Sequence, residues 1–119
     1  LRSAESRGAR FGAHSMTHPI LSRCDDDQAT HEIIGSVQRV RSELKRPSSV
    51  FCYPVGCPIS FGEREISIVK RAGMLGALST SPGTLTQRSV GTADVNWLWR
   101  LPRMGYEERQ GAMARIALL

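Results

Sequence analysis

Two of the three histidines in the chain lie four residues apart, in the segment Phe11-Gly12-Ala13-His14-Ser15-Met16-Thr17-His18-Pro19. Imidazoles at this spacing can face the same side of one tight turn and bind one metal ion together. A catalytic zinc site usually has three protein ligands and a water, so a third ligand should come from another strand end. The candidate carboxylates in this chain are Asp25, Asp26, Asp27 and Asp94. The spacing alone leaves open whether the two histidines are ligands or structural residues.

The turn Tyr53-Pro54-Val55-Gly56 is a second candidate site. Pro54 has no amide hydrogen and Gly56 tolerates unusual backbone angles, so the Val55 amide could remain free to face a ligand. A free amide at a strand end is what an oxyanion site needs. An ordinary loop is the alternative that the pattern leaves open.

The chain contains three cysteines, Cys24, Cys52 and Cys57, and no Cys-x-x-Cys pair. An odd number without such a pair argues against a disulfide framework and against a structural zinc knuckle. Cys52 and Cys57 flank the turn and could join the histidines at zinc, but a five-residue step is unusual for mixed sites. We therefore expect buried free thiols.

The length of 119 residues corresponds to one domain or part of one, and we treat 1–119 as a single partial domain. The net charge is +5, but the arginines are scattered along the chain and no aromatic platform accompanies them. This pattern favours a solvated basic surface over a nucleic-acid binder, which remains the lowest-ranked alternative. No apolar run is long enough to span a bilayer, and no leader is visible before Leu1, so neither a membrane span nor a signal peptide is expected.

The elements that must position these residues follow the order of βα units. Residues 1–4 resemble the end of a helix whose beginning is absent, with Gly8 as its stop signal. We expect strands at 10–14, 50–53, 76–80 and 97–101. Helices are expected from the Asp25-Asp26-Asp27 cap to Pro47, over 63–72 before Gly73, and over 107–119. Alternating strands and helices predict an α/β fold with parallel pairing.

The apolar periodicity predicts which faces turn inward. The first long helix, capped by Asp26 or Asp27, has an apolar face of Ala29, Ile33, Val37, Val40 and Leu44. On its opposite side lie His31, Gln38 and Ser42, so His31 is expected at the surface. The other residues predicted to face inward are Phe11, Ala13, Ile20, Leu21, Ile66, Val69, Ala72, Met113, Ile116 and Ala117. Trp97 and Trp99 alternate, so one should face the core and the other solvent or a groove, where it could stack on a sugar.

Several of these segments together resemble the polysaccharide deacetylases, the NodB-homology enzymes of carbohydrate esterase family four. Residues 12–19 with Leu21 resemble the His-Ser/Thr-x-x-His-Pro motif of that family. The similarity continues through Glu32-Ile33, Phe51-Cys52-Tyr53-Pro54-Val55-Gly56, Ala72-Gly73-Met74 and Ala77. It closes with Leu101-Pro102-Arg103-Met104, which is similar to a Leu-Pro-Arg-Ile segment late in one branch.

The resemblance implies a distorted (β/α) barrel, here partial, and metal-dependent removal of acetyl groups from an N-acetylated glycan. It implies that His14 and His18 bind a divalent metal, usually zinc, and that the Val55 amide helps to hold the oxyanion. Tyr53, Pro54 and Gly56 would contact substrate. Family members commonly act outside the cytoplasm on cell-wall or exported polysaccharide.

The chain also departs from the family pattern. The Thr-Phe-Asp-Asp-Gly segment, which supplies the third metal ligand and the catalytic base N-terminal to the histidines, has no counterpart, nor has the late Leu-x-His motif. Cys52 stands where many members have arginine. We therefore expect a C-terminal portion of such a domain that is inactive by itself. The alternative is a non-catalytic carbohydrate- or metal-binding module.

Overall fold

The computed structural model describes residues 1–83, 85 and 95–103. In chain order the elements are α1 (Arg2–Ser6), the 3-10 helix η1 (Leu21–Arg23), α2 (Asp26–Glu43), β1 (Val50–Cys52), α3 (Glu63–Arg71), β2 (Gly76–Leu78) and the 3-10 helix η2 (Asn96–Arg100). β1 and β2 pair in parallel, with Phe51 opposite Ala77, and a parallel bridge joins Leu78 to Leu101. The expected α/β class with parallel pairing is therefore confirmed. The helix expected at 107–119 lies outside the described residues.

The long helix α2 forms as its periodicity predicts. Its cap is Asp25, whose Oδ1 accepts a 2.7 Å hydrogen bond from the Gln28 amide, so the prediction of Asp26 or Asp27 as the cap is wrong by one or two residues. Asp26 and Asp27 lie in the first turn instead, where their charges favour the positive end of the helix dipole. The helix ends at Glu43, short of Pro47, because Leu44 already adopts an extended backbone.

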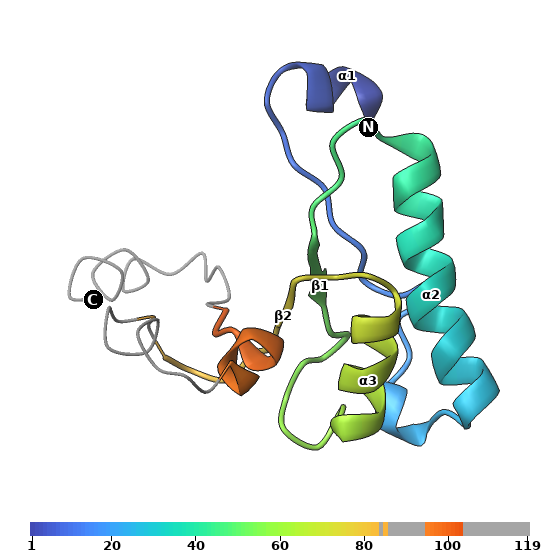
Figure 1. Cartoon of the computed structure of the whole chain (residues 1–119), viewed down its shortest axis with the longest axis vertical. Coiled ribbons are helices and arrows are strands. Elements are labelled where there is room, and N and C mark those ends of the chain that lie inside the picture. The colour runs from blue at the N-terminus through green and yellow to red at the C-terminus, as the bar shows by residue number, and fades with distance from the viewer. Residues whose placement is uncertain (84, 86–94, 104–119) are drawn as a thin grey trace, which may run out of the picture.

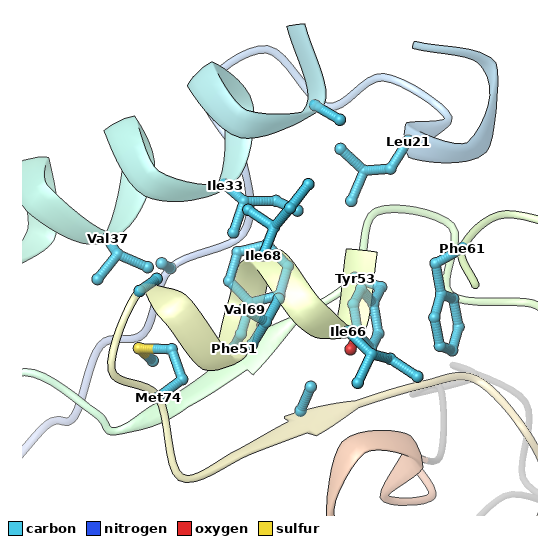
Figure 2. Packing of buried hydrophobic residues seen from close by; sticks show 14 of the residues in the cluster. Leu21, Ile33, Val37, Phe51, Tyr53, Phe61, Ile66, Ile68, Val69 and Met74 are labelled. Carbon is cyan, nitrogen blue, oxygen red and sulfur yellow. The ribbon is translucent and has the colours of Figure 1, made fainter. Parts of the chain in front are cut away.

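One hydrophobic core lies between the sheet and the two long helices. In Figure 1, α2 and α3 lie to one side of β1 and β2. Figure 2 shows their side chains converging on one cluster, with Phe51 of β1 beneath residues of both helices. Its members are Ala13, Leu21, Cys24, Ala29, Ile33, Val37, Phe51, Tyr53, Phe61, Ile66, Ile68, Val69, Ala72, Met74 and Ala77. The predicted inward faces of both helices are confirmed.

Helix α3 is capped at both ends. The Glu65 carboxylate accepts a 2.7 Å bond from the Gly62 amide at the start, and Gly73 takes φ 74° just beyond the end. A left-handed residue after the last turn is the usual glycine stop. The helix therefore matches the predicted span to within one residue.

Two of the predicted strands are absent. Residues 10–14 run extended beside β1, with the Phe11 and Ala13 carbonyls accepting bonds from Ser48 and Cys52, but they are not a strand. Gly12 permits this approach, since a Cβ there would lie 2.9 Å from the Val50 oxygen.

Residues 97–101 were expected to form a strand, and this prediction is wrong for all but Leu101. The chain turns through η2 instead, with the Leu98 amide bonded to the Val95 carbonyl. A short apolar run cannot by itself distinguish a strand from a tight helix. Gly76 of β2 permits the helix to approach, because a Cβ at Gly76 would lie 2.8 Å from the Leu98 oxygen.

No helix in the part of the chain that the structure describes is long and apolar enough to cross a membrane.

Candidate metal-binding turn and its neighbouring oxyanion turn

The first histidine, His14, is held by the backbone of β1. Its Nδ1 lies 2.8 Å from the Cys52 carbonyl oxygen. Because a carbonyl can only accept, Nδ1 must carry the proton, and the lone pair of neutral His14 is then on Nε2. Backbone carbonyls fix the tautomer and orientation of metal-binding histidines in this way. His14 is therefore oriented with Nε2 available as a ligand.

The second histidine, His18, is brought to His14 by a strained turn. Ser15 has φ 63° and His18 has φ 62°, and the Ser15 hydroxyl oxygen accepts a 3.0 Å bond from the His18 amide. The two ring centres are 4.9 Å apart, with the ring planes at 72°. Two imidazoles bound to one tetrahedral zinc at about 2.0–2.1 Å would have ring centres about 5 Å apart. The separation of the two ring centres is therefore compatible with two ligands of one zinc ion.

A buried carboxylate holds this turn against α2. Glu32, which is 4% exposed, accepts bonds from the Met16 and Thr17 amides at 2.8 and 2.9 Å. Its other oxygen accepts a 2.6 Å bond from the Thr17 hydroxyl. Burial raises the pKa of Glu32, but the bonds from Thr17 and Met16 outweigh it and lower the pKa from its ordinary value.

The sequence analysis named Glu32 only within the Glu32-Ile33 segment of the family resemblance and predicted no role for it in the site. Its signal is a glutamate on the core-facing side of an amphipathic helix, between Ala29 and Ile33. Such a group must find hydrogen-bond donors when it is buried.

The described part of the chain offers no third ligand beside the two histidines. No group of three or more His, Cys, Asp or Glu side chains in the described part of the chain could hold a metal ion. Asp25 caps α2, and Asp26 is exposed and paired with Arg64. Asp94 lies outside the described residues. The structure thus brings His14 and His18 together and leaves the described aspartates away from them.

The turn after β1 is as strained as the histidine turn. Val55 has φ 62°, and the Gly56 amide donates a 2.6 Å bond to the Pro54 carbonyl, which closes a γ-turn around Val55. Ser15, His18 and Val55 are the non-glycine residues with positive φ in the part of the chain that is described. Positive φ is a genuine outlier for a β-branched residue, and such strain is concentrated at functional sites.

The Val55 amide is free of acceptors in the described part of the chain. Val55 is 43% exposed, and its backbone carbonyl accepts a 3.2 Å bond from the Thr80 hydroxyl. A side chain at Gly56 would be strained and crowded, since Gly56 has φ 75° and a Cβ there would lie 3.1 Å from the Thr80 amide nitrogen. The turn therefore presents one unpaired backbone donor at the end of β1.

Tyr53 and Pro54, expected to contact substrate, are both fully buried. The Tyr53 ring stacks on Phe61 at 3.8 Å and meets Phe51 edge-on at 5.5 Å. Burial also raises the pKa of its phenol, whose hydroxyl has no hydrogen-bond partner among the described residues. In this conformation the side chains of Tyr53 and Pro54 belong to the core, and Val55 is the exposed residue of the turn.

All three cysteines are free thiols, and Cys24 is buried. Cys52 is half-buried, and burial raises the pKa of its thiol more than neighbouring Arg103 lowers it. Arg103 Nη1 donates to the Cys52 sulfur at 2.7 Å.

The remaining predictions concern His31 and the two tryptophans, Trp97 and Trp99. His31 is exposed on α2, as expected. Trp97 and Trp99 are both half-buried, and they lie on η2 instead of on the strand that was expected to alternate them. Trp99 packs against the core, with Lys70 5.1 Å from its ring centre.

Comparison with known proteins identifies the family. A family model described as polysaccharide deacetylase matches residues 1–77, which include the histidine turn, α2, β1, the Val55 turn and α3. Searches of curated proteins and of solved structures gave no significant match. The match covers more than half of the chain, and the chain therefore belongs to the polysaccharide deacetylase family.

Proposed function

We propose that this domain takes part in the metal-dependent removal of acetyl groups from an N-acetylated polysaccharide. The observation that carries the proposal is the oriented histidine pair, in which the Cys52 carbonyl fixes His14 and the ring of His18 lies 4.9 Å away. His14 and His18 would hold a divalent metal, with zinc as the expected ion because imidazole is one of its usual ligands. Bound there, the metal would supply Lewis-acid polarisation of the acetyl carbonyl and of the attacking water.

Other residues of this chain would stabilise the oxyanion, support the histidine turn and line the substrate side. The Val55 amide would donate to the oxygen that becomes negative when water adds to the acetyl carbon. Glu32, through the Thr17 and Met16 backbone, would keep the histidine turn in its strained form. The backbone around Tyr53, Pro54 and Gly56 would line the substrate side of this turn.

A complete site would also need carboxylates, one as the third metal ligand and one as the base. In the described part of the chain no carboxylate joins His14 and His18 in a group that could hold a metal ion. We therefore propose that the 119-residue chain binds metal weakly and deacetylates poorly, and that the complete site belongs to a distorted (β/α) barrel of which these elements are part. The polysaccharide substrate is proposed from the family.

Zinc binding tests the metal part directly. The chain is titrated with zinc alone, and binding is compared among wild type, His14→Ala, His18→Ala and the control His31→Ala, which removes an exposed histidine. We expect a loss of about tenfold or more in affinity for the first two variants and none for the control. Equal zinc affinity in all four proteins would refute the assignment.

A deacetylation assay tests the proposed activity and the incomplete site. Acetylated chitooligosaccharide is incubated with the zinc-loaded chain, and free amine is measured. We expect turnover far below that of an intact family member, and turnover at the level of the intact enzyme would contradict the incomplete-site proposal. Glycan binding without activity, unchanged in the His14→Ala and His18→Ala variants, would favour a non-catalytic module instead.

A further inference from the structure

Two loops of the candidate site are joined to each other near both of their ends. The first loop, residues 14–22, contains the histidine turn, and the second, residues 52–60, contains the turn after β1. At their beginnings the Cys52 amide donates to the Ala13 carbonyl at 3.0 Å. His14 Nδ1 donates to the Cys52 carbonyl at 2.8 Å. These two bonds form the first connection between the loops.

A serine forms the second connection. The Ser22 amide donates to the Ser60 carbonyl at 3.0 Å, and the Ser22 hydroxyl donates to the Ile59 carbonyl at 2.8 Å. Ser60 is 1% exposed, and its amide and hydroxyl both donate to the Cys57 carbonyl, at 2.9 and 2.8 Å. The second loop is therefore closed on itself where Ser22 binds it, so Ser22 is attached to a segment of defined shape.

The strained residues of the site lie between the two connections. Ser15, His18 and Val55 have positive φ, and they are the non-glycine residues with this conformation in the described part of the chain. His18 is four residues from His14 and four from Ser22, so it is midway between the two connections. A strained backbone persists where the surrounding structure leaves it no alternative. The two connections supply that constraint, because each loop is held before and after its strained residues.

We propose that Ser22 is a positioning residue, which holds His18 at a fixed place relative to Val55. The inference rests on the proposed function, in which a metal on His18 and the Val55 amide act on the same acetyl oxygen. Two groups that act on one oxygen must keep their separation, because small displacements of such groups are costly to the reaction. Glu32 and Thr80 each bind one of the two turns to the rest of the fold, whereas Ser22 joins the two loops to each other.

The test compares the 119-residue chain with Ser22→Ala, which removes the hydroxyl, and with Ser22→Thr, which keeps it. The matched control is Ser42→Ala, because the Ser42 hydroxyl donates to the Arg39 carbonyl at the same 2.8 Å within α2. For each protein we measure the dissociation constant for zinc alone and the urea unfolding curve. NMR of the zinc-free chains records the amide signals of His18 and Val55, each four residues before one end of the bond.

We expect Ser22→Ala to bind zinc about three- to tenfold more weakly, since a hydrogen bond that supports the second ligand is lost. The amide signals of His18 and Val55 should both move in this variant. Ser22→Thr should restore the zinc affinity and both signals to those of wild type. Ser42→Ala should lose a similar part of its resistance to urea while keeping the wild-type zinc affinity and signals.

In a chain that binds zinc, two results would overturn the proposal. One is an equal dissociation constant in wild type and Ser22→Ala, and the other is an equal loss of zinc affinity in Ser22→Ala and Ser42→Ala. The zinc-free spectra keep this test separate from the proposed function. If wild type binds no zinc, the metal assignment fails, whereas signals of His18 and Val55 that move in Ser22→Ala and return in Ser22→Thr support the positioning role. Unchanged signals in such a chain would refute it.

Discussion

The substitution Glu32→Ala should unfold the histidine turn or destabilise the domain. The Glu32 carboxylate is 4% exposed and accepts three hydrogen bonds, two from amides and one from the Thr17 hydroxyl. Alanine would leave these three donors without an acceptor inside the protein. A buried donor left unpaired costs about 1–3 kcal/mol, and part of that cost is recovered if the turn opens to water.

The net loss in unfolding free energy should therefore be about 3 kcal/mol, a large part of the 5–15 kcal/mol typical of a domain. Glu32→Gln keeps an acceptor oxygen and most of the shape, so its loss should be smaller, about 1–2 kcal/mol. Urea unfolding followed by circular dichroism measures both changes. The control is Gln38→Ala, on the exposed side of α2, which should change stability by less than about 0.5 kcal/mol.

Zinc binding gives the second readout for Glu32. If Glu32 holds the turn, Glu32→Ala should also weaken zinc binding by about tenfold, as the loss of an outer-shell partner commonly does. A Glu32→Ala protein with wild-type stability and wild-type zinc affinity would refute the reasoning. A loss of stability with unchanged zinc affinity would limit Glu32 to a structural role.

Three further predictions concern strain, pH and packing. Val55→Gly should raise the unfolding free energy by about 0.5–1 kcal/mol in a urea titration, because glycine accepts φ 62° without strain. A lower unfolding free energy in this variant would contradict the inference that the Val55 backbone is strained. Burial raises the pKa of Glu5, but the bonds that it accepts from the Arg46 and Lys45 amides outweigh burial and lower it below the ordinary 4.5. This contribution to stability is therefore present above about pH 4.5 and lost as the pH falls below that value. Melting temperatures at pH 3 to 7 should show a smaller acid loss for Glu5→Gln than for wild type, and parallel curves would contradict this. Phe51→Ala removes a fully buried ring beneath both long helices and should lower the unfolding free energy by about 3–5 kcal/mol. A decrease below about 1 kcal/mol in a urea titration would show that Phe51 does not anchor the core.

The elements with a strong local pattern could be predicted from the sequence. The apolar repeat through Ala29, Ile33 and Val37 is sufficient to place α2, because burying such a face stabilises a helix wherever it packs. Gly73 marks the end of α3 for a similar reason, since few other residues accept the left-handed conformation there. The histidine turn and the Tyr53 to Gly56 turn were likewise visible in residue types and spacing.

Tertiary contacts decided the rest. Glu32 became a support of the histidine turn because α2 packs against residues 16 and 17, and no local pattern encodes that contact. The chain around Trp97 forms η2 against β2, and Gly76, about twenty residues away in sequence, leaves the room that the Leu98 carbonyl needs there. His14 and His18 could be recognised as a pair from the sequence. Only the fold places the Cys52 carbonyl at Nδ1 of His14, because that bond joins segments that are far apart in the chain.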